Sequence, residues 1–247
     1  MRFSVANWRA ISPFHHSIDD WINWCSQSSS IDSKLPQLPD LSFLPAMKRR
    51  RLSPLARLMF AAAWPLVGDT QNLPLVFVSH DGEVNRSLEL WRSLLSEGDV
   101  SPASFALSVH NAIAGQWSLM RQDMSETVAL CAHTNGLELA IVEACGLLAA
   151  GHEKVLVVVA DEPLVKSDIK TQRTPFEYAL ALIVTPGDSW ELLYQANDDT
   201  ISRSFVSNNY YSSALTWIEN QLDLQSSATS SWQVHTKAGY WQWSRGA

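Results

Sequence analysis

Apolar side chains recur along the chain with two periods, and each period predicts one kind of secondary structure. Near the start, Phe3 and Val5 alternate with polar or small neighbours, a period of two that predicts a first strand ending near Trp8. Elsewhere, continuous apolar runs rich in β-branched residues predict strands that are covered on both faces. These runs occupy residues 73–79, 127–131, 154–160 and 178–185, and shorter strands are expected at 191–195 and 231–235.

Helical periods separate these strands. Helices are expected to begin at Ser17, which acidic residues follow, and at Ser53, which a proline follows, because serine caps helix N-termini and proline suits the first turn. Another begins at Glu83 and ends at Gly98. Its apolar face is formed by Leu88, Trp91, Leu94 and Leu95. A helix over 137–150 is apolar nearly all round and should be buried, and a last one is expected from about 212 to 222.

Strands that alternate with helices predict an α/β fold. We expect a mostly parallel, mixed sheet with helices on both faces, formed by residues 1–247 as a single domain. The stretch 26–45 is rich in serine and proline and is expected to be an irregular surface segment.

Composition narrows the classes of function. With 46% hydrophobic residues and a net charge of −7, the chain is neither disordered nor suited to duplex nucleic acid, which requires a basic face. No apolar run is long enough to span a membrane and no signal peptide begins the chain, so a soluble, cytoplasmic protein is expected. Three cysteines without ligand spacing argue against disulfides and zinc. Eleven tryptophans hint at a partner, because tryptophan is enriched at protein contacts.

Three stretches resemble one protein family. The run SPASFALSVHNAIAG at 101–115, the elbow at 132–137 and the strand entry at 151–155 are similar to the N-terminal half of a β-ketoacyl synthase, of thiolase fold. More narrowly, the chain resembles the short ketosynthase-like subunits that act as chain-length factors in aryl polyene biosynthesis. The resemblance is densest over 73–185 and implies a truncated thiolase-like fold. No cofactor is expected, because the sequence holds no GxGxxG motif, P-loop or metal-ligand cluster.

The resemblance also implies which residues carry out the chemistry of a ketosynthase. The family's active-site cysteine falls on His133, because the residues from Thr134 to Leu137 match those that follow the nucleophile. The family's two catalytic histidines belong to the second half of its fold, and only His152 and His235 follow the elbow here. We therefore expect a non-catalytic subunit that depends on a full-length β-ketoacyl synthase, with an acyl carrier protein reached through the complex.

Family members dimerise through a strand and a preceding segment that correspond to 127–131 and 101–120. A short sheet would in any case leave an open edge and apolar surface for a partner. The candidates for the partner surface and acyl tunnel are Ser104, Phe105, Val109, His110, Asn111, Ile113, Trp117, Thr127, Ala129 and Cys131. The alternative is that Phe105, Val109 and Ile113 only pack beneath the sheet, because apolar residues at helical spacing usually form core.

Other interpretations stay open. The chain is alternatively a small acyl-carrier thioester hydrolase or decarboxylase that uses His133 or Cys131, or a free-standing acyl-binding protein. His80 and Glu83 form either an acid/base pair or an ordinary turn followed by a first-turn glutamate. The basic cluster of Lys48, Arg49, Arg50 and Arg51 is either a solvated patch or a contact for an acidic carrier protein.

Overall fold

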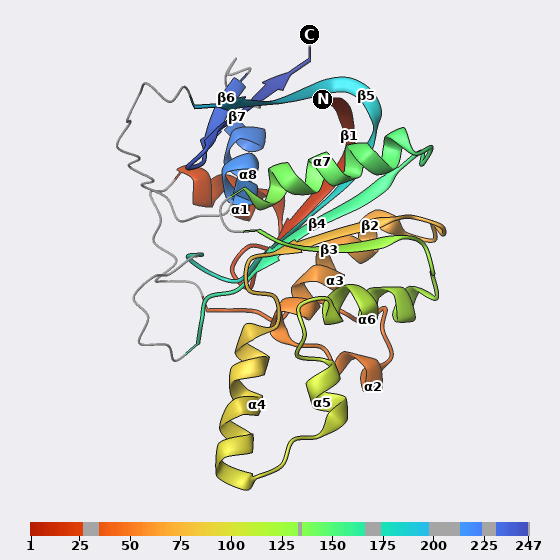
Figure 1. Ribbon diagram of the computed structural model, residues 1–247, viewed down its shortest axis with the longest axis vertical. Coiled ribbons are helices and arrows are strands. Elements are labelled where there is room, and N and C mark those ends of the chain that lie inside the picture. Colours follow the sequence, from red (N-terminus) through yellow and green to blue (C-terminus); the bar gives the residue numbers. More distant parts are fainter. Residues whose placement is uncertain (27–34, 133–134, 166–173, 198–212, 224–230, 247) are drawn as a thin grey trace.

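The computed structural model describes residues 1–26, 35–132, 135–165, 174–197, 213–223 and 231–246. A seven-stranded sheet runs through the molecule, with helices on both of its faces (Figure 1). The strands are β1 (Arg2–Ile11), β2 (Leu75–Ser79), β3 (Thr127–Cys131), β4 (Val155–Asp161), β5 (Tyr178–Ala196), β6 (Ser231–His235) and β7 (Gly239–Arg245). The helices are α1 (Ile18–Ser26), α2 (Ala46–Arg49), α3 (Pro54–Val67), α4 (Val84–Glu97), α5 (Pro102–Ala106), α6 (Ala112–Arg121), α7 (Gly136–Ala149) and α8 (Ser213–Asp223).

The strand order is β3-β2-β4-β5-β7-β6, with β1 paired to β5. Among the described strands, β2–β3 and β2–β4 are parallel, whereas β1–β5, β4–β5, β5–β7 and β6–β7 are antiparallel. The expected mixed sheet is confirmed, but the expectation that it is mostly parallel is wrong. A continuous apolar run shows that a strand is buried but does not show its direction relative to its neighbours. The short connection between β6 and β7 makes these two strands antiparallel.

Two apolar cores lie on opposite faces of the sheet. One joins β2, β4 and β5 to α7 and α8, with Trp217 and Trp243 among its fully buried side chains. The other joins the same strands to α3 and α6. Helix α3 begins as predicted, since Ser53 Oγ accepts a hydrogen bond from the backbone N–H of Ala56 and Pro54 follows. Helices on both faces are therefore confirmed.

Several boundaries differ from those expected. The candidates at 178–185 and 191–195 are parts of one strand, β5, and β7 was not predicted. Helix α7 is buried on one side only, because Val142 is exposed. Of the irregular segment 26–45, residues 35–45 form no helix or strand, and 27–34 lie outside the described residues. Within the described ranges, no helix has the length and apolar character needed to cross a membrane.

Candidate functional site

Strand β3 stands at one end of the strand order, and among the described residues β2 is its only pairing partner. Its side chains are half-buried or exposed, with Thr127 and Cys131 exposed at its two ends and Ala129 half-buried between them. The backbone groups on its outer side are therefore placed to pair with another strand. This edge is one end at which a partner could extend the sheet.

The segment before β3 divides the candidate tunnel residues into two groups. Phe105 is 62% exposed and Val109 is 41% exposed, and Asn111 is also exposed. Ile113 and Trp117, in contrast, are buried in the core between the sheet and α3. Ile113 and Trp117 therefore pack beneath the sheet, whereas Phe105 and Val109 are exposed and do not. Ser104 and His110 are half-buried.

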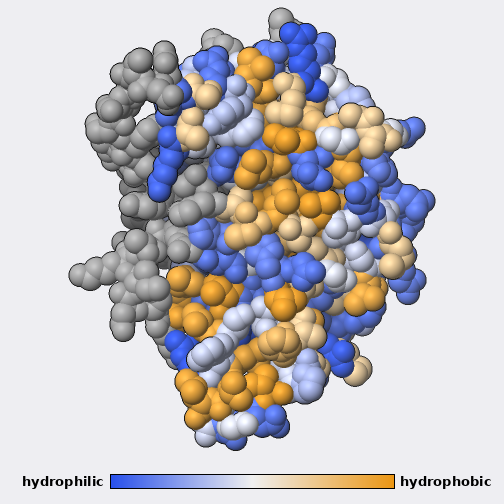
Figure 2. Space-filling model, viewed as in Figure 1, coloured by the Kyte–Doolittle hydropathy of each residue, from blue (hydrophilic) through white to orange (hydrophobic). Residues whose placement is uncertain are grey.

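Helix α4 has the apolar face that its period predicts, but Leu88, Trp91, Leu94 and Leu95 on this face are all exposed. None of its residues is buried, Trp91 is 66% exposed and Leu95 is 77% exposed. Figure 1 shows α4 and α5 projecting together below the sheet. Figure 2 shows hydrophobic side chains gathered over this projection, and a second group at the level of α7. An exposed apolar surface of this kind is typical of a protein–protein contact.

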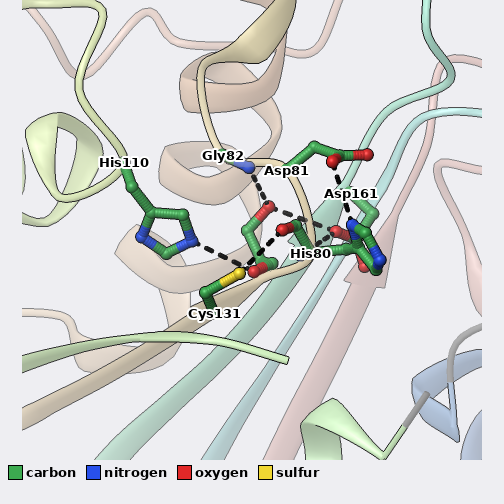
Figure 3. A network of polar contacts seen from close by, with 7 residues as sticks. His80, Asp81, Gly82, His110, Cys131 and Asp161 are labelled. Atoms are coloured by element: carbon green, nitrogen blue, oxygen red, sulfur yellow. Dashed lines mark hydrogen bonds and ion pairs between the residues drawn. The ribbon is translucent and has the colours of Figure 1, made fainter. Parts of the chain in front are cut away.

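A polar network lies where β2, β3 and β4 end (Figure 3). Asp161, the last residue of β4, accepts hydrogen bonds at Oδ1 from Ser79 Oγ at 3.1 Å and from the His80 backbone N–H at 2.7 Å. Its Oδ2 accepts from the Tyr178 hydroxyl at 3.2 Å. The carbonyl of Ser79 accepts a hydrogen bond from His110 Nε2 at 3.1 Å, so Nε2 carries the proton. The network thus links the sheet to the 101–115 segment.

Burial shifts the pKa values of the acids around this network. Desolvation raises the pKa of Asp161 to about 6, although its three hydrogen bonds favour the charged form. Desolvation also raises the pKa of Glu162 to about 7, with a further contribution from the neighbouring charges of Glu83, Glu177 and Glu89. Burial also raises the pKa of Glu83. The Glu83 carboxylate accepts a hydrogen bond from Ser53 Oγ at 2.5 Å.

The geometry separates His80 from Glu83. His80 Nδ1 lies 2.9 Å from Asp81 Oδ1, whereas Glu83 stands at the N-cap position of α4 and its side chain accepts a hydrogen bond from Ser53. The turn followed by a helix-start glutamate is therefore the interpretation that the contacts favour. The contacts of these two side chains therefore go to different partners, Asp81 for His80 and Ser53 for Glu83.

The strand-to-helix elbow is described only on its two sides, because His133 and Thr134 lie outside the described residues. Asn135 precedes α7, and a Cβ at Gly136 would lie 3.1 Å from Val78 Cγ1, so a residue without a side chain lets the helix start approach β2. Cys131 Sγ donates a hydrogen bond to the carbonyl of His80 at 3.0 Å. Burial raises the pKa of Cys145, which fits a packing role for that thiol.

The basic cluster is at the surface. Lys48, Arg50 and Arg51 are exposed and Arg49 is half-buried, at the end of α2. The backbone of the cluster is fixed, since the carbonyl of Arg49 accepts a hydrogen bond from Arg57 Nη2 at 2.9 Å. Three of the four side chains are therefore open to a charged partner.

Comparison with known proteins identifies the family. The family model for the β-ketoacyl synthase N-terminal domain matches residues 21–244 of this chain. The chain belongs to this family. A search of curated proteins found no match.

Solved structures of family members share the fold. A chain of the complex between the ketosynthase ApeO and its chain length factor ApeC from Xenorhabdus doucetiae has a TM-score of 0.83 and 24% identity, over 99% of this chain and 100% of that one. A chain of the AntDE:AntF complex, a type II polyketide synthase acyl-carrier protein with its ketosynthase, has a TM-score of 0.66 and 12% identity, over 99% of each chain. A β-ketoacyl synthase from Burkholderia phymatum has a TM-score of 0.57 and 14% identity, over 84% of this chain and 67% of that one. The thiolase-like ketosynthase fold expected from the sequence is thereby confirmed.

Two features of this site were not found from the sequence. The network around Asp161 joins β4, β2 and the 110 region, which are far apart in the chain, and no local motif marks it. The exposure of α4 was also missed, although four large apolar residues on a helix that also carries Arg86 and Arg92 were a signal. A helical period shows that a face exists but not what covers it.

Proposed function

We propose that this chain is a non-catalytic, chain-length-factor-like subunit that forms a heterodimer with a full-length β-ketoacyl-ACP synthase and shapes its acyl tunnel. The pathway would be the aryl polyene or polyketide type of fatty acid biosynthesis. The observation that carries the proposal is the unpaired edge of β3 beside exposed apolar side chains on α4 and α5. Both features need a partner to cover them.

The comparisons and the sequence support the two halves of this proposal. The fold is shared with complexes described as a ketosynthase with its chain length factor, which supports the pairing. His133 stands where the family resemblance places the nucleophilic cysteine, which supports a non-catalytic role. Cys131, the other candidate nucleophile, donates a hydrogen bond to a backbone carbonyl.

The tunnel-shaping role is proposed for the exposed residues of the 101–111 segment. Phe105 and Val109 are available to a partner, whereas Ile113 and Trp117 are committed to this chain's own core. A bulky side chain at the end of an acyl tunnel limits the length of the chain that the tunnel can hold. Phe105 is the strongest candidate because it is the largest exposed side chain of the segment.

A carrier-protein contact is proposed for Lys48, Arg49, Arg50 and Arg51. One related structure is described as an acyl-carrier protein in complex with its ketosynthase. The support here is charge complementarity between an exposed basic cluster and an acidic carrier, which steers association and is weakened by salt.

The deciding experiment combines association with turnover. The chain is co-expressed with a full-length β-ketoacyl synthase, and the pair is purified through a tag on the synthase alone. We expect a stable complex that elongates acyl-carrier thioesters, and no turnover by this chain by itself. Hydrolysis of an acyl thioester by the isolated chain, abolished by His133→Ala or Cys131→Ala, would instead establish the hydrolase alternative. A stable monomer that binds fatty acyl chains would establish an acyl-binding protein.

A further inference from the structure

The turn after β2 holds the 101–115 segment at one polar point. Ser79 O accepts the hydrogen bond from His110 Nε2, and Gly82, two residues beyond His80, packs directly on the same ring. Gly82 has a φ of +56°, and a Cβ there would lie 2.8 Å from His110 Cδ2. A side chain at Gly82 would therefore clash with the ring of His110. A shift of His110 would break its hydrogen bond to the Ser79 carbonyl.

Asp161 fixes this turn from the neighbouring strand. Its Oδ1 accepts from Ser79 Oγ and from the His80 N–H, and Ser79 Oγ in turn accepts from the Gly82 N–H at 2.9 Å. Asp161 and Ser79 are both buried. In Figure 3 the Asp161 carboxylate and the His110 ring lie on opposite sides of the turn that they both contact. The position of His110 thus depends on a carboxylate that His110 does not touch.

His110 lies next to the exposed residues of the segment. It follows Val109 directly and lies between α5, which carries Phe105, and α6. A second anchor comes from α4, where Ser87 Oγ donates to the Ser108 carbonyl at 2.8 Å. With these two contacts, the exposed Phe105 and Val109 are held at a fixed place relative to the sheet.

We infer that Asp161 and Ser79 are positioning residues for product length: acting through His110, they hold Phe105 and Val109 at the tunnel wall of the partner synthase. This inference rests on the proposed function and deepens it. Neither residue would contact the acyl chain, because both are buried under the turn.

The first test uses the chain alone and needs no partner. Hydrogen exchange is measured at the amides of residues 105–112 in Ser79→Ala and Asp161→Ala, with unfolding temperatures recorded for each. We expect exchange there to become roughly five- to tenfold faster, the effect of losing one or two hydrogen bonds. Asp161→Asn should restore the slow exchange, because its amide oxygen still accepts from Ser79 and His80. Tyr178→Phe is the matched control, since it removes a bond to the same carboxylate without touching the turn.

The second test measures product lengths of the complex with a full-length β-ketoacyl synthase. We expect Ser79→Ala and Asp161→Ala to broaden the distribution of product lengths at least twofold, and Asp161→Asn and Tyr178→Phe to leave it as in the wild type. The inference is overturned if exchange at 105–112 does not change, or if it rises while an assembled complex keeps its product distribution. A wild-type chain that binds no synthase would refute the proposed function, while the exchange result still decides whether Asp161 and Ser79 hold the segment.

Discussion

Asp161 and Glu162 make the stability of this protein depend on pH. Burial raises the pKa of Asp161 from 3.8 to about 6 and that of Glu162 from 4.5 to about 7. Each of these carboxyls therefore binds its proton more tightly in the native state than in the unfolded state. The resulting stabilisation of the native state is complete below about pH 4. It is lost as the pH rises through about 6 for Asp161 and about 7 for Glu162. For Asp161 the difference corresponds to about 3 kcal/mol.

We expect the free energy of unfolding, measured by urea denaturation, to fall between pH 4 and pH 7. Asp161→Asn has no proton to lose, so it should flatten the part of this fall that lies below pH 6. Glu162→Gln should flatten the part that lies between about pH 5 and pH 7. If both variants keep the wild-type slope, these carboxyls do not have raised pKa values in the native state.

Phe105 is the residue at which the proposed tunnel role is most directly measured. Phe105→Ala removes exposed bulk and little core packing, so stability should change by less than about 0.5 kcal/mol. The products of the complex should shift toward longer chains. Ile113→Ala is the contrast, because that side chain is fully buried and its truncation should cost about 2–5 kcal/mol of stability. An unchanged product distribution in Phe105→Ala would contradict the placement of Phe105 at the tunnel.

The tryptophans show why composition alone misleads. Six of the eleven are buried, four are half-buried, and only Trp91 is exposed. Most of this tryptophan serves the chain's own cores, for example where the rings of Trp232 and Trp243 stack at 5.5 Å between centroids. The count by itself therefore does not indicate a partner, whereas the one exposed ring on α4 does.

Local sequence predicted where most strands and helices lie but not how they are arranged. The runs at 73–79, 127–131 and 154–160 became β2, β3 and β4, and the Ser53 cap started α3. The antiparallel pairing of β1 with β5 was not predictable in this way, because it joins Arg2 to Glu191 and depends on the whole connection between them. The same limit applies to the site: helical spacing grouped Phe105 with Ile113, and only the packing of the sheet separates them.

The apolar face of α4 is expected to contribute directly to association. Truncating a hot-spot residue at an interface, a class in which tryptophan is enriched, weakens binding by about 2 kcal/mol, or roughly 30-fold. We therefore expect Trp91→Ser combined with Leu95→Ser to raise the dissociation constant of the synthase complex at least that much, measured by titration of the purified subunits. Arg92→Ser, on the same exposed helix, is the matched control and should bind as the wild type does. Equal weakening by the control would mean that the face itself makes no specific contact.

The basic cluster at α2 makes a separate, salt-dependent prediction. Replacing Lys48, Arg49, Arg50 and Arg51 by serine should raise the KM for the acyl-carrier protein and reduce its dependence on ionic strength, since screening acts on charge pairs. Binding of the synthase should not change, which separates this surface from α4. If the variant with these four replacements keeps the wild-type turnover with the carrier protein and its salt dependence, the cluster is only a solvated patch.

The sheet as a whole offers two ends to a partner, and the structure favours one of them. At β6, the side chains alternate between exposed polar residues and ones packed on the core, as in an ordinary solvent-facing strand. At β3, the flanking helices α6 and α7 carry the exposed Leu119 and Val142 on opposite faces of the sheet, and Met124 is exposed just before the strand. Helices α4 and α5 project on the α6 side in Figure 1. A partner that pairs with β3 could cover all of these at once.

Hydrogen exchange of the assembled complex distinguishes the two ends. In the isolated chain, the outward amides of 127–131 should exchange quickly, because β2 is the only strand of the described part of the chain that pairs with β3. In the synthase complex they should be protected at least tenfold, together with amides of α4 and α5, while those of 231–235 keep their rates. The amides of β4 are an internal control, since that strand is paired on both sides in the chain alone. Protection at 231–235 with none at 127–131 would show that the partner extends the opposite end of the sheet, and the tunnel role of Phe105 would fail with it.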